Sequence, residues 1–115
     1  EPSRVCIHCF TGSKEDLEAY VSRGYFIGLT GFAGMQKRGA HIRELLTRGA
    51  IPLKQLMLET DCPFMMPDRH LLPASIGIQG RRNEPCAMPA VCRAVAECLG
   101  LAPEAVARAT TENAV

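Results

Sequence analysis

The chain has 115 residues, a formal net charge of +1 and 47% hydrophobic, 22% charged and 5% aromatic residues. This length fits one domain and excludes a complete two-domain enzyme, and the composition excludes a disordered or collagen-like chain. No stretch approaches the roughly 20 apolar residues of a membrane helix, and the chain does not open with a secretory signal. We therefore expect a protein without a membrane segment.

The chain contains six cysteines. This density is below that of a small domain held together by disulfides, and most of the cysteines lie inside apolar runs. We therefore expect buried thiols in a reducing compartment, the cytoplasm.

The first half of the chain alternates predicted strands with predicted helices. Short apolar runs indicate strands covered on both faces, as in a parallel sheet, and Gly28 inside one of them indicates the close approach of another group. Ser13, with Asp16 three residues on, forms the capping box that begins the first helix, and Gly24 ends it. The predicted elements are strands over 4–10, 25–30 and 55–60 and helices over 14–23 and 40–48.

The second half opens with an irregular segment over 63–85 that is rich in proline and glycine. A loop of this length is uncommon unless it is functional. Pro89 then opens a helix that ends at Gly100, and Pro103 opens a last helix. The order of these elements predicts βαβ units and an α/β fold with a parallel sheet.

Two polar side chains, His8 and Asp61, lie where predicted strands end, which is where reactive groups collect in parallel α/β folds. Each also has a structural interpretation: His8 as a satisfied core histidine, and Asp61 as the cap of the turn that follows it. Strand alternation places Glu59 on the same face as Asp61. There, Glu59 could accept a hydrogen bond from a metal-ligating imidazole or pair with a buried Arg or Lys.

Cys6 and Cys9 form a C-x-x-C pair, which suggests a redox pair or half of a zinc site. We disfavour both interpretations. The two cysteines are predicted on opposite faces of an extended strand, and no second C-x-x-C follows to complete a tetrahedral site.

Basic residues concentrate in two segments of the chain. The first contains five of them against one acid, which suits either a polyanion or a solvated helix face. In the second, Arg81 and Arg82 lie in the long loop, and guanidinium groups bind phosphate bidentately. With so few aromatic residues, contact with a nucleic-acid backbone is more plausible than base recognition. The five residues of the first segment are Lys37, Arg38, Arg43, Arg48 and Lys54.

Four motifs, in order, resemble those of the TatD family of metal-dependent deoxyribonucleases. The closing residues, 111–114, also resemble the last helix of that family. The four motifs are HCFTGS at 8–13, YFIGLTG at 25–31, LETDCP at 58–63 and RRNEP at 81–85.

The resemblance implies the C-terminal part of a (β/α)8 TIM-type barrel, with residues 1–115 as a single partial domain. It implies divalent metal ions (Mg, Mn or Zn) held by His8 and Asp61, and hydrolysis of phosphodiester bonds in DNA, as an exonuclease, by the full-length parent. Asp61 would also handle the proton of the attacking water, and Glu59 would support the His8 imidazole. The resemblance implies that Asn83 and Glu84 order the loop or contact substrate, and Arg82 beside them is a candidate for substrate binding through its guanidinium group.

Other metal ligands of the family, a His-x-His pair, a glutamate and a further histidine, lie on strands with no counterpart here. Because a (β/α)8 barrel needs about 250 residues, we expect a piece of a longer protein, with open sheet edges, an apolar inner face and an incomplete site. Two alternatives remain open. One is a metal-dependent hydrolase of a small ester, lactone or amide, and the other is a truncated half-barrel without catalytic activity.

Overall fold

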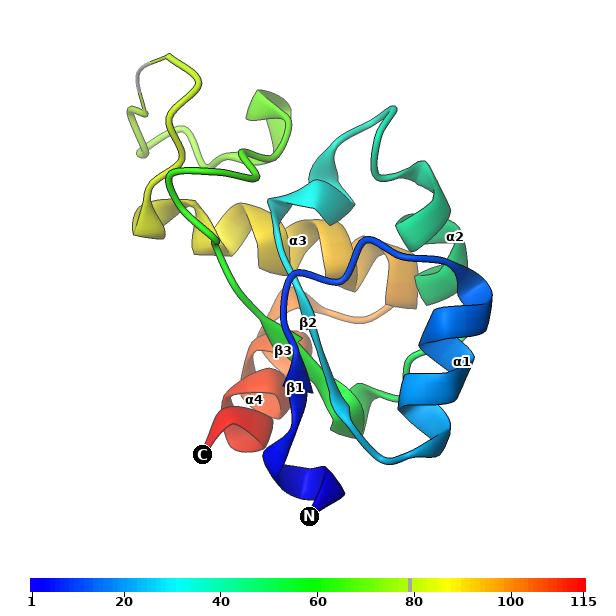
Figure 1. Ribbon diagram of the computed structural model, residues 1–115. Coiled ribbons are helices and arrows are strands. Elements are labelled where there is room, and N and C mark those ends of the chain that lie inside the picture. The colour runs from blue at the N-terminus through cyan, green and yellow to red at the C-terminus, as the bar shows by residue number, and fades with distance from the viewer. Residues whose placement is uncertain (79) are drawn as a thin grey trace.

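The framework of the protein is a parallel three-stranded sheet in the order β1-β2-β3, seen in a computed structural model that describes residues 1–78 and 80–115. The register pairs Ile7 with Ile27 and Ile27 with Leu56. The carboxyl ends of the strands point toward the upper part of Figure 1, where the long loop lies. The predicted α/β fold with a parallel sheet is confirmed. The strands are β1 (Cys6–Ile7), β2 (Phe26–Leu29) and β3 (Leu56–Leu58).

Helices connect these strands and cover the sheet (Figure 1). The capping box is present, because the Ser13 hydroxyl accepts a hydrogen bond from the Asp16 N–H at 3.2 Å. The segments before β3, before α3 and within the long loop contain short 3-10 helices. The helices are α1 (Lys14–Ser22), α2 (Ala40–Thr47), α3 (Met88–Leu99) and α4 (Pro103–Ala114), with η1 (Pro2–Arg4), η2 (Gly31–Gly34), η3 (Leu53–Gln55), η4 (Arg69–Leu71) and η5 (Pro85–Ala87).

The hydrophobic core lies between one face of the sheet and the helices. Ile27, Leu29 and Leu56 are fully buried on that face, and burial of a large aliphatic side chain stabilises the fold by about 1.5–3 kcal/mol. On the other face Cys6 is exposed and Met57 is half-buried. The helices of the described residues therefore cover one face of the sheet more completely than the other. The helical partners in this core include Leu17, Ile42, Leu46, Val95 and Val106.

The last two helices meet at a sharp bend. Among the described residues no single helix is long and apolar enough to cross a membrane, whereas Pro85–Leu99 and Pro103–Ala114, bent by 108°, pass that test of length and composition only as a pair. The apolar side of α3 packs against the rest of the protein, since Val91 and Val95 are fully buried.

An asparagine holds the start of β3. Asn113, near the end of α4, donates hydrogen bonds from Nδ2 to the carbonyl oxygens of Leu53 at 2.9 Å and Leu56 at 2.6 Å. These contacts attach the last helix to the entrance of the strand. The end of β3 is held by a second asparagine, described below.

The structure differs from the sequence predictions in the length of the first strand and in the burial of the cysteines. The strand is only two residues long, because η1 precedes it and Cys9, at φ +50°, turns the chain out of the extended conformation. The prediction of buried thiols holds only for Cys92, since Cys6 and Cys86 are exposed and the other three cysteines are half-buried. Cys6 lies on the less covered face of the sheet, so an apolar run was no guide to its burial. Gln79, part of the predicted irregular loop, lies outside the described residues.

Candidate active site

The predicted metal ligands and their supporting carboxylate lie at the carboxyl ends of β1 and β3. His8 directly follows β1, Glu59 directly follows β3, and Asp61 lies two residues further on. The His8 side chain is 67% exposed and that of Glu59 is 26% exposed. An accessible imidazole thus stands beside a partly shielded carboxylate.

Glu59 connects the ends of the two strands with both of its carboxylate oxygens. Oε1 lies 2.9 Å from His8 Nδ1, and Oε2 accepts a hydrogen bond from the Cys9 backbone N–H at 2.7 Å. The first contact orients the ring and favours a proton on Nδ1, which leaves the lone pair of Nε2 free to bind a cation. The second holds the backbone at the left-handed turn that follows β1.

The Glu59 carboxylate reaches this position because residue 28, on the central strand, is glycine. A Cβ at Gly28 would lie 2.1 Å from Glu59 Oε2 and 3.0 Å from its Cδ. Any larger residue would displace the carboxylate, since real Cβ contacts are never so short. The prediction that this interior glycine marks a close approach is confirmed.

The electrostatics around His8 favour positive charge. The hydrogen bond with Glu59 raises the pKa of His8 above its ordinary value of 6.5, the negative charge of Glu59 adds to the rise, and so does that of Asp61, while partial desolvation acts in the opposite direction. The same carboxylates that stabilise a proton on the imidazole would stabilise a metal cation beside it.

Asp61 has an uncommon backbone conformation. Its φ of +55° lies in the left-handed region, which costs an L-residue roughly 1–2 kcal/mol, although aspartate tolerates it better than most. The carbonyl of Asp61 accepts a hydrogen bond from the Phe64 N–H at 2.9 Å, which closes a turn shortly after β3. Because Asp61 lies in this turn, strand alternation does not determine where its side chain lies.

The two thiols of the C-x-x-C pair are not activated. Burial raises the pKa of Cys9, and the carboxylates of Asp61 and Glu59 add to the rise against an opposing hydrogen bond with Thr30. Burial and the charge of Glu59 likewise raise the pKa of Cys6. Thiols with raised pKa values are poor nucleophiles and poor zinc ligands, so these contacts favour protonated cysteines at neutral pH.

The donors present fit a divalent cation in kind but not in number. Within residues 1–78 and 80–115, no group of three or more His, Cys, Asp and Glu side chains converges on one point. The structure brings the His8 imidazole against the Glu59 carboxylate, and the predicted ligand types, imidazole and carboxylate, suit hard or borderline ions such as Mg²⁺, Mn²⁺ and Zn²⁺. The described residues therefore do not by themselves form a complete metal site.

The predicted substrate-binding residues differ in exposure. Arg82 and Glu84 are exposed, whereas Asn83 between them is only 2% exposed. The Asn83 side-chain amide donates hydrogen bonds to the carbonyl oxygens of Thr60 at 2.9 Å and Phe64 at 2.8 Å. The motif thus presents two charged side chains around a buried anchor.

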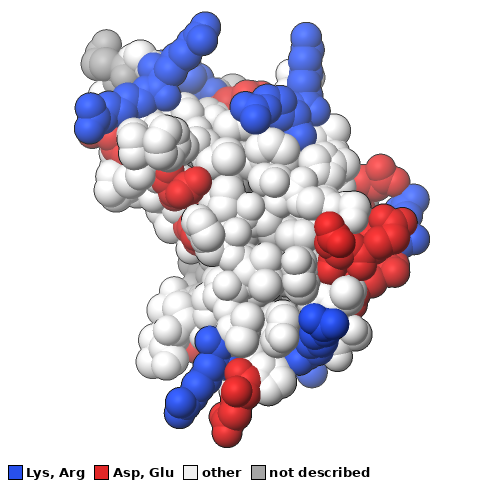
Figure 2. All heavy atoms as spheres, in the orientation of Figure 1, with Lys and Arg blue, Asp and Glu red and all other residues white. Residues whose placement is uncertain are grey.

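Basic side chains gather at the end of the molecule where the strands terminate. Figure 2 shows Lys and Arg over the long loop and over the connection from η2 to α2. The exposed residues there include Lys37 and Arg38 on one side and Arg81 and Arg82 on the other. The carboxyl ends of the strands are therefore flanked by positive charge from two loops.

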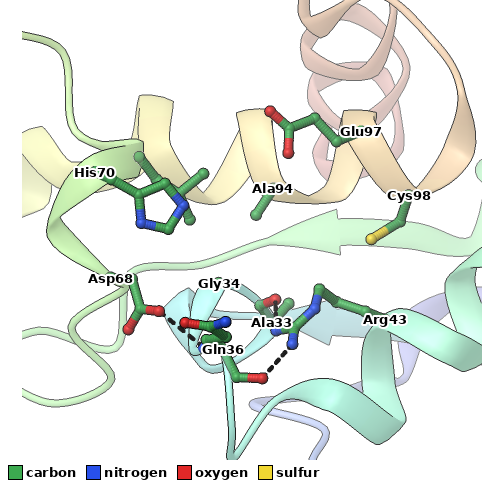
Figure 3. A pocket seen from close by; sticks show the side chains of 10 residues that line it. Ala33, Gly34, Gln36, Arg43, Asp68, His70, Ala94, Glu97 and Cys98 are labelled. Carbon is green, nitrogen blue, oxygen red and sulfur yellow. Dashed lines mark hydrogen bonds between the residues drawn. The ribbon is translucent and has the colours of Figure 1, made fainter.

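Not every basic residue of the first segment is available to a ligand. Arg43 lines a cavity of about 370 Å³ beside α3 (Figure 3). Its Nη1 donates to the carbonyl oxygens of Ala33 at 3.0 Å and Met35 at 2.6 Å. Arg48 pairs with Glu44 at 2.8 Å on the same helix. Arg43 thus stabilises the end of η2, and the residues that line this cavity include none of the predicted site residues.

One further candidate did not emerge from the sequence. Phe64, three residues after Asp61, is 67% exposed. An aromatic residue after a Cys-Pro pair gives no local signal of exposure, because its environment depends on the path of the long loop. Its position next to the site makes it a surface on which a nucleobase could stack.

Comparison with known proteins gives a consistent result. The model of the family described as TatD related DNase matches residues 1–115. The 3'-5' ssDNA/RNA exonuclease TatD of Erwinia billingiae (strain Eb661) is 43% identical over 109 residues, covering 94% of this chain and 39% of that protein. The corresponding protein of Dickeya dadantii (strain 3937) is 44% identical with the same coverage. The chain thus spans about two fifths of the length of these relatives.

Solved structures show the same fold. The TatD homologue YJJV from Escherichia coli K12 superposes with a TM-score of 0.76 at 29% identity, over 97% of this chain and 39% of the other. An uncharacterized amidohydrolase from Saccharomyces cerevisiae has a TM-score of 0.80 at 23% identity, over 99% of this chain and 40% of the other. The fold is therefore part of a TIM-type barrel, as predicted.

In the metal-free protein, Glu59→Gln should lower the pKa of His8 toward 6.5, because the amide provides neither the charge-assisted hydrogen bond nor the negative charge. Since folding raises this pKa, the pair stabilises the protein fully below 6.5 and loses this contribution as the pH rises through the raised value. The difference in free energy of unfolding between the wild type and Glu59→Gln should therefore shrink as the pH rises through the raised pKa of His8. Ring titration by NMR and urea unfolding measure both effects.

Glu97→Gln is the matched control, because Glu97 is exposed on α3 and pairs with Arg93. It should leave the His8 titration unchanged. An unchanged His8 pKa in Glu59→Gln, or an equal shift in both variants, would contradict the role of Glu59.

Proposed function

The chain belongs to the TatD related DNase family, and from this premise we propose that the protein of which it forms part is a divalent-metal-dependent nuclease that hydrolyses phosphodiester bonds in DNA. The observation that carries the proposal is the contact of His8 Nδ1 with Glu59 at 2.9 Å, at the carboxyl ends of two parallel strands. The names of the curated relatives, 3'-5' ssDNA/RNA exonucleases, support exonuclease action on a single strand.

Each residue at the strand ends has a distinct proposed role. His8, through Nε2, and the Asp61 carboxylate would hold a divalent ion, which when bound supplies a Lewis acid that activates water and neutralises charge on the phosphate oxygens. Glu59 keeps the His8 ring oriented and its Nδ1 protonated. Asp61 would also accept the proton of the attacking water. The remaining ligands would come from parts of the longer protein outside this chain.

The substrate would approach across the basic loops. Arg82 would contact phosphate, Glu84 would contact the substrate or order the loop, and Lys37 and Arg38 extend the positive surface away from the site. Phe64 offers an exposed ring for stacking a base, which tolerates any sequence. These contacts suit recognition of a single strand through its backbone.

We also propose a cytoplasmic location. The six cysteines, all within the described part of the chain, are free thiols. Exposed thiols such as Cys6 and Cys86 persist in a reducing compartment and are prone to oxidation elsewhere.

In the full-length protein, Asp61→Asn should abolish cleavage of a single-stranded oligonucleotide with little loss of stability, because the amide is a poor metal ligand and a poor proton acceptor but has the same shape. The matched control is Asp16→Asn, at an exposed aspartate in the first turn of α1. Cleavage rates and urea unfolding of the three proteins provide the test. Wild-type cleavage by Asp61→Asn would refute the assignment.

Arg82→Ala should raise KM for the oligonucleotide with kcat nearly unchanged, because the contact is made equally to the bound substrate and the transition state. The slope of log(kcat/KM) against log salt concentration should become shallower by about 0.7, the contribution of one phosphate contact on a single strand. Arg108→Ala, at an exposed arginine of α4, serves as the control. Assays of a small ester substrate run in parallel should show no turnover. Efficient ester turnover that is insensitive to salt would favour the small-molecule hydrolase instead.

A further inference from the structure

We propose that Asn83 is a positioning residue whose buried side-chain amide holds Asp61 in the backbone conformation that presents its carboxylate to the metal. The inference rests on the proposed function in so far as Asp61 is a metal ligand. It assigns Asn83 a role distinct from the substrate contact made by its charged neighbours.

The contacts of Asn83 enclose Asp61 on both sides. Nδ2 donates to the carbonyl of Thr60, the residue before Asp61, at 2.9 Å, and to that of Phe64, three residues after it, at 2.8 Å. The Asn83 backbone N–H donates to the carbonyl of Pro63 at 3.0 Å. One residue thus binds three of the five carbonyls between Thr60 and Phe64.

The amide is itself held in one orientation. Its Oδ1 accepts a hydrogen bond from the Glu84 N–H at 2.9 Å, so both ends of the amide have partners and the two donors face the turn. Asn83 is 2% exposed, which shields these hydrogen bonds from exchange with water. A side chain so buried and so fully engaged supports the backbone rather than the substrate.

The turn needs this support because the sheet no longer holds it. The last hydrogen bond between this segment and β2 is the one that the Glu59 N–H donates to the Leu29 carbonyl at 2.8 Å. Beyond it, Asp61 and Met65 both have left-handed φ values, +55° and +59°. Asn83 supplies, from 19 to 23 residues away in sequence, the donors that a neighbouring strand would otherwise provide.

The other side of the same segment packs against Gly31, the first residue of η2, which follows β2. A Cβ at Gly31 would lie 1.9 Å from the Met65 carbonyl oxygen and 2.7 Å from Pro67 Cδ. The turn is therefore confined between Gly31 on one side and Asn83 on the other. Its position relative to β2, and with it the position of Asp61, is set by these two contacts.

The chain contains its own control for this inference. Asn113 makes the same kind of contact at the opposite end of β3, where its Nδ2 donates to two backbone carbonyls at 2.9 Å and 2.6 Å. Replacing either asparagine with aspartate removes the donors and retains the shape. Both changes should destabilise the fold, but only the change at position 83 should affect the metal site.

The test measures Mn²⁺ affinity of the full-length protein by isothermal calorimetry, together with its unfolding midpoint in urea. We expect Asn83→Asp to weaken Mn²⁺ binding by about 10-fold or more, as the loss of partners that orient metal ligands generally does. Asn113→Asp should leave the affinity unchanged while lowering the midpoint. Equal losses of affinity in the two variants, or an unchanged affinity in Asn83→Asp, would overturn the proposal.

Asp61→Asn in the same titration separates failure of this inference from failure of the proposed function. If Asp61→Asn leaves Mn²⁺ affinity unchanged, Asp61 is not a ligand and both are wrong. If Asp61→Asn weakens binding and Asn83→Asp does not, only the positioning role of Asn83 is wrong.

If Asn83→Asp fails to fold, hydrogen–deuterium exchange of the wild-type protein tests the proposal instead. Because coupling is reciprocal, a metal bound by Asp61 must stabilise the turn that Asn83 holds. Mg²⁺ should therefore slow hydrogen–deuterium exchange of the Phe64 and Asn83 backbone amides, which donate to Asp61 and Pro63. Exchange of these amides that is insensitive to saturating Mg²⁺ would overturn the proposal.

Discussion

The Glu59 carboxylate is the contact on which the rest of the site depends. One oxygen orients the His8 ring, the other holds the backbone of Cys9, and the carboxylate reaches both only because Gly28 has no side chain. This one partly shielded carboxylate thereby fixes the end of β1 relative to the end of β3. Without it, the imidazole would be an exposed side chain free to sample several rotamers, and a freely rotating ligand binds metal poorly.

The turn that contains Asp61, the second proposed ligand, is held by different contacts. Asp61 lies beyond the last hydrogen bond of the sheet, and the turn that contains it is closed by Phe64 and held by Asn83. At the other end of the strand, Asn113 ties α4 to the residues around Leu56. The backbone hydrogen bonds of the sheet stop at the two ends of β3. There, side-chain amides donate the hydrogen bonds that backbone carbonyls accept. This arrangement fixes the backbone at both ends of a strand of only three residues.

Local patterns were sufficient for the order and type of the main helices and strands and for the close approach at Gly28. The capping box at Ser13, the close approach at Gly28 and the polar residues after apolar runs all follow from short-range rules. The predictions that failed concern features that depend on contacts between residues far apart in the sequence. The turn at Cys9 exists because a carboxylate 50 residues away accepts its N–H, and Asn83 is buried because it hydrogen-bonds to a turn about 20 residues earlier. Burial of individual cysteines failed for the same reason, since it depends on which face of the sheet the helices cover.

The most direct test of the role of Glu59 is the tautomeric state of His8 in the metal-free protein, measured by long-range ¹H–¹⁵N correlation NMR at a pH where the ring is neutral. A carboxylate on Nδ1 requires the proton to reside on that nitrogen, so the spectrum should show the Nδ1–H tautomer with an unprotonated Nε2. Glu59→Gln should shift the equilibrium toward the other tautomer. A dominant Nε2–H form in the wild type would contradict the account, because the nitrogen assigned to the metal would then carry the proton.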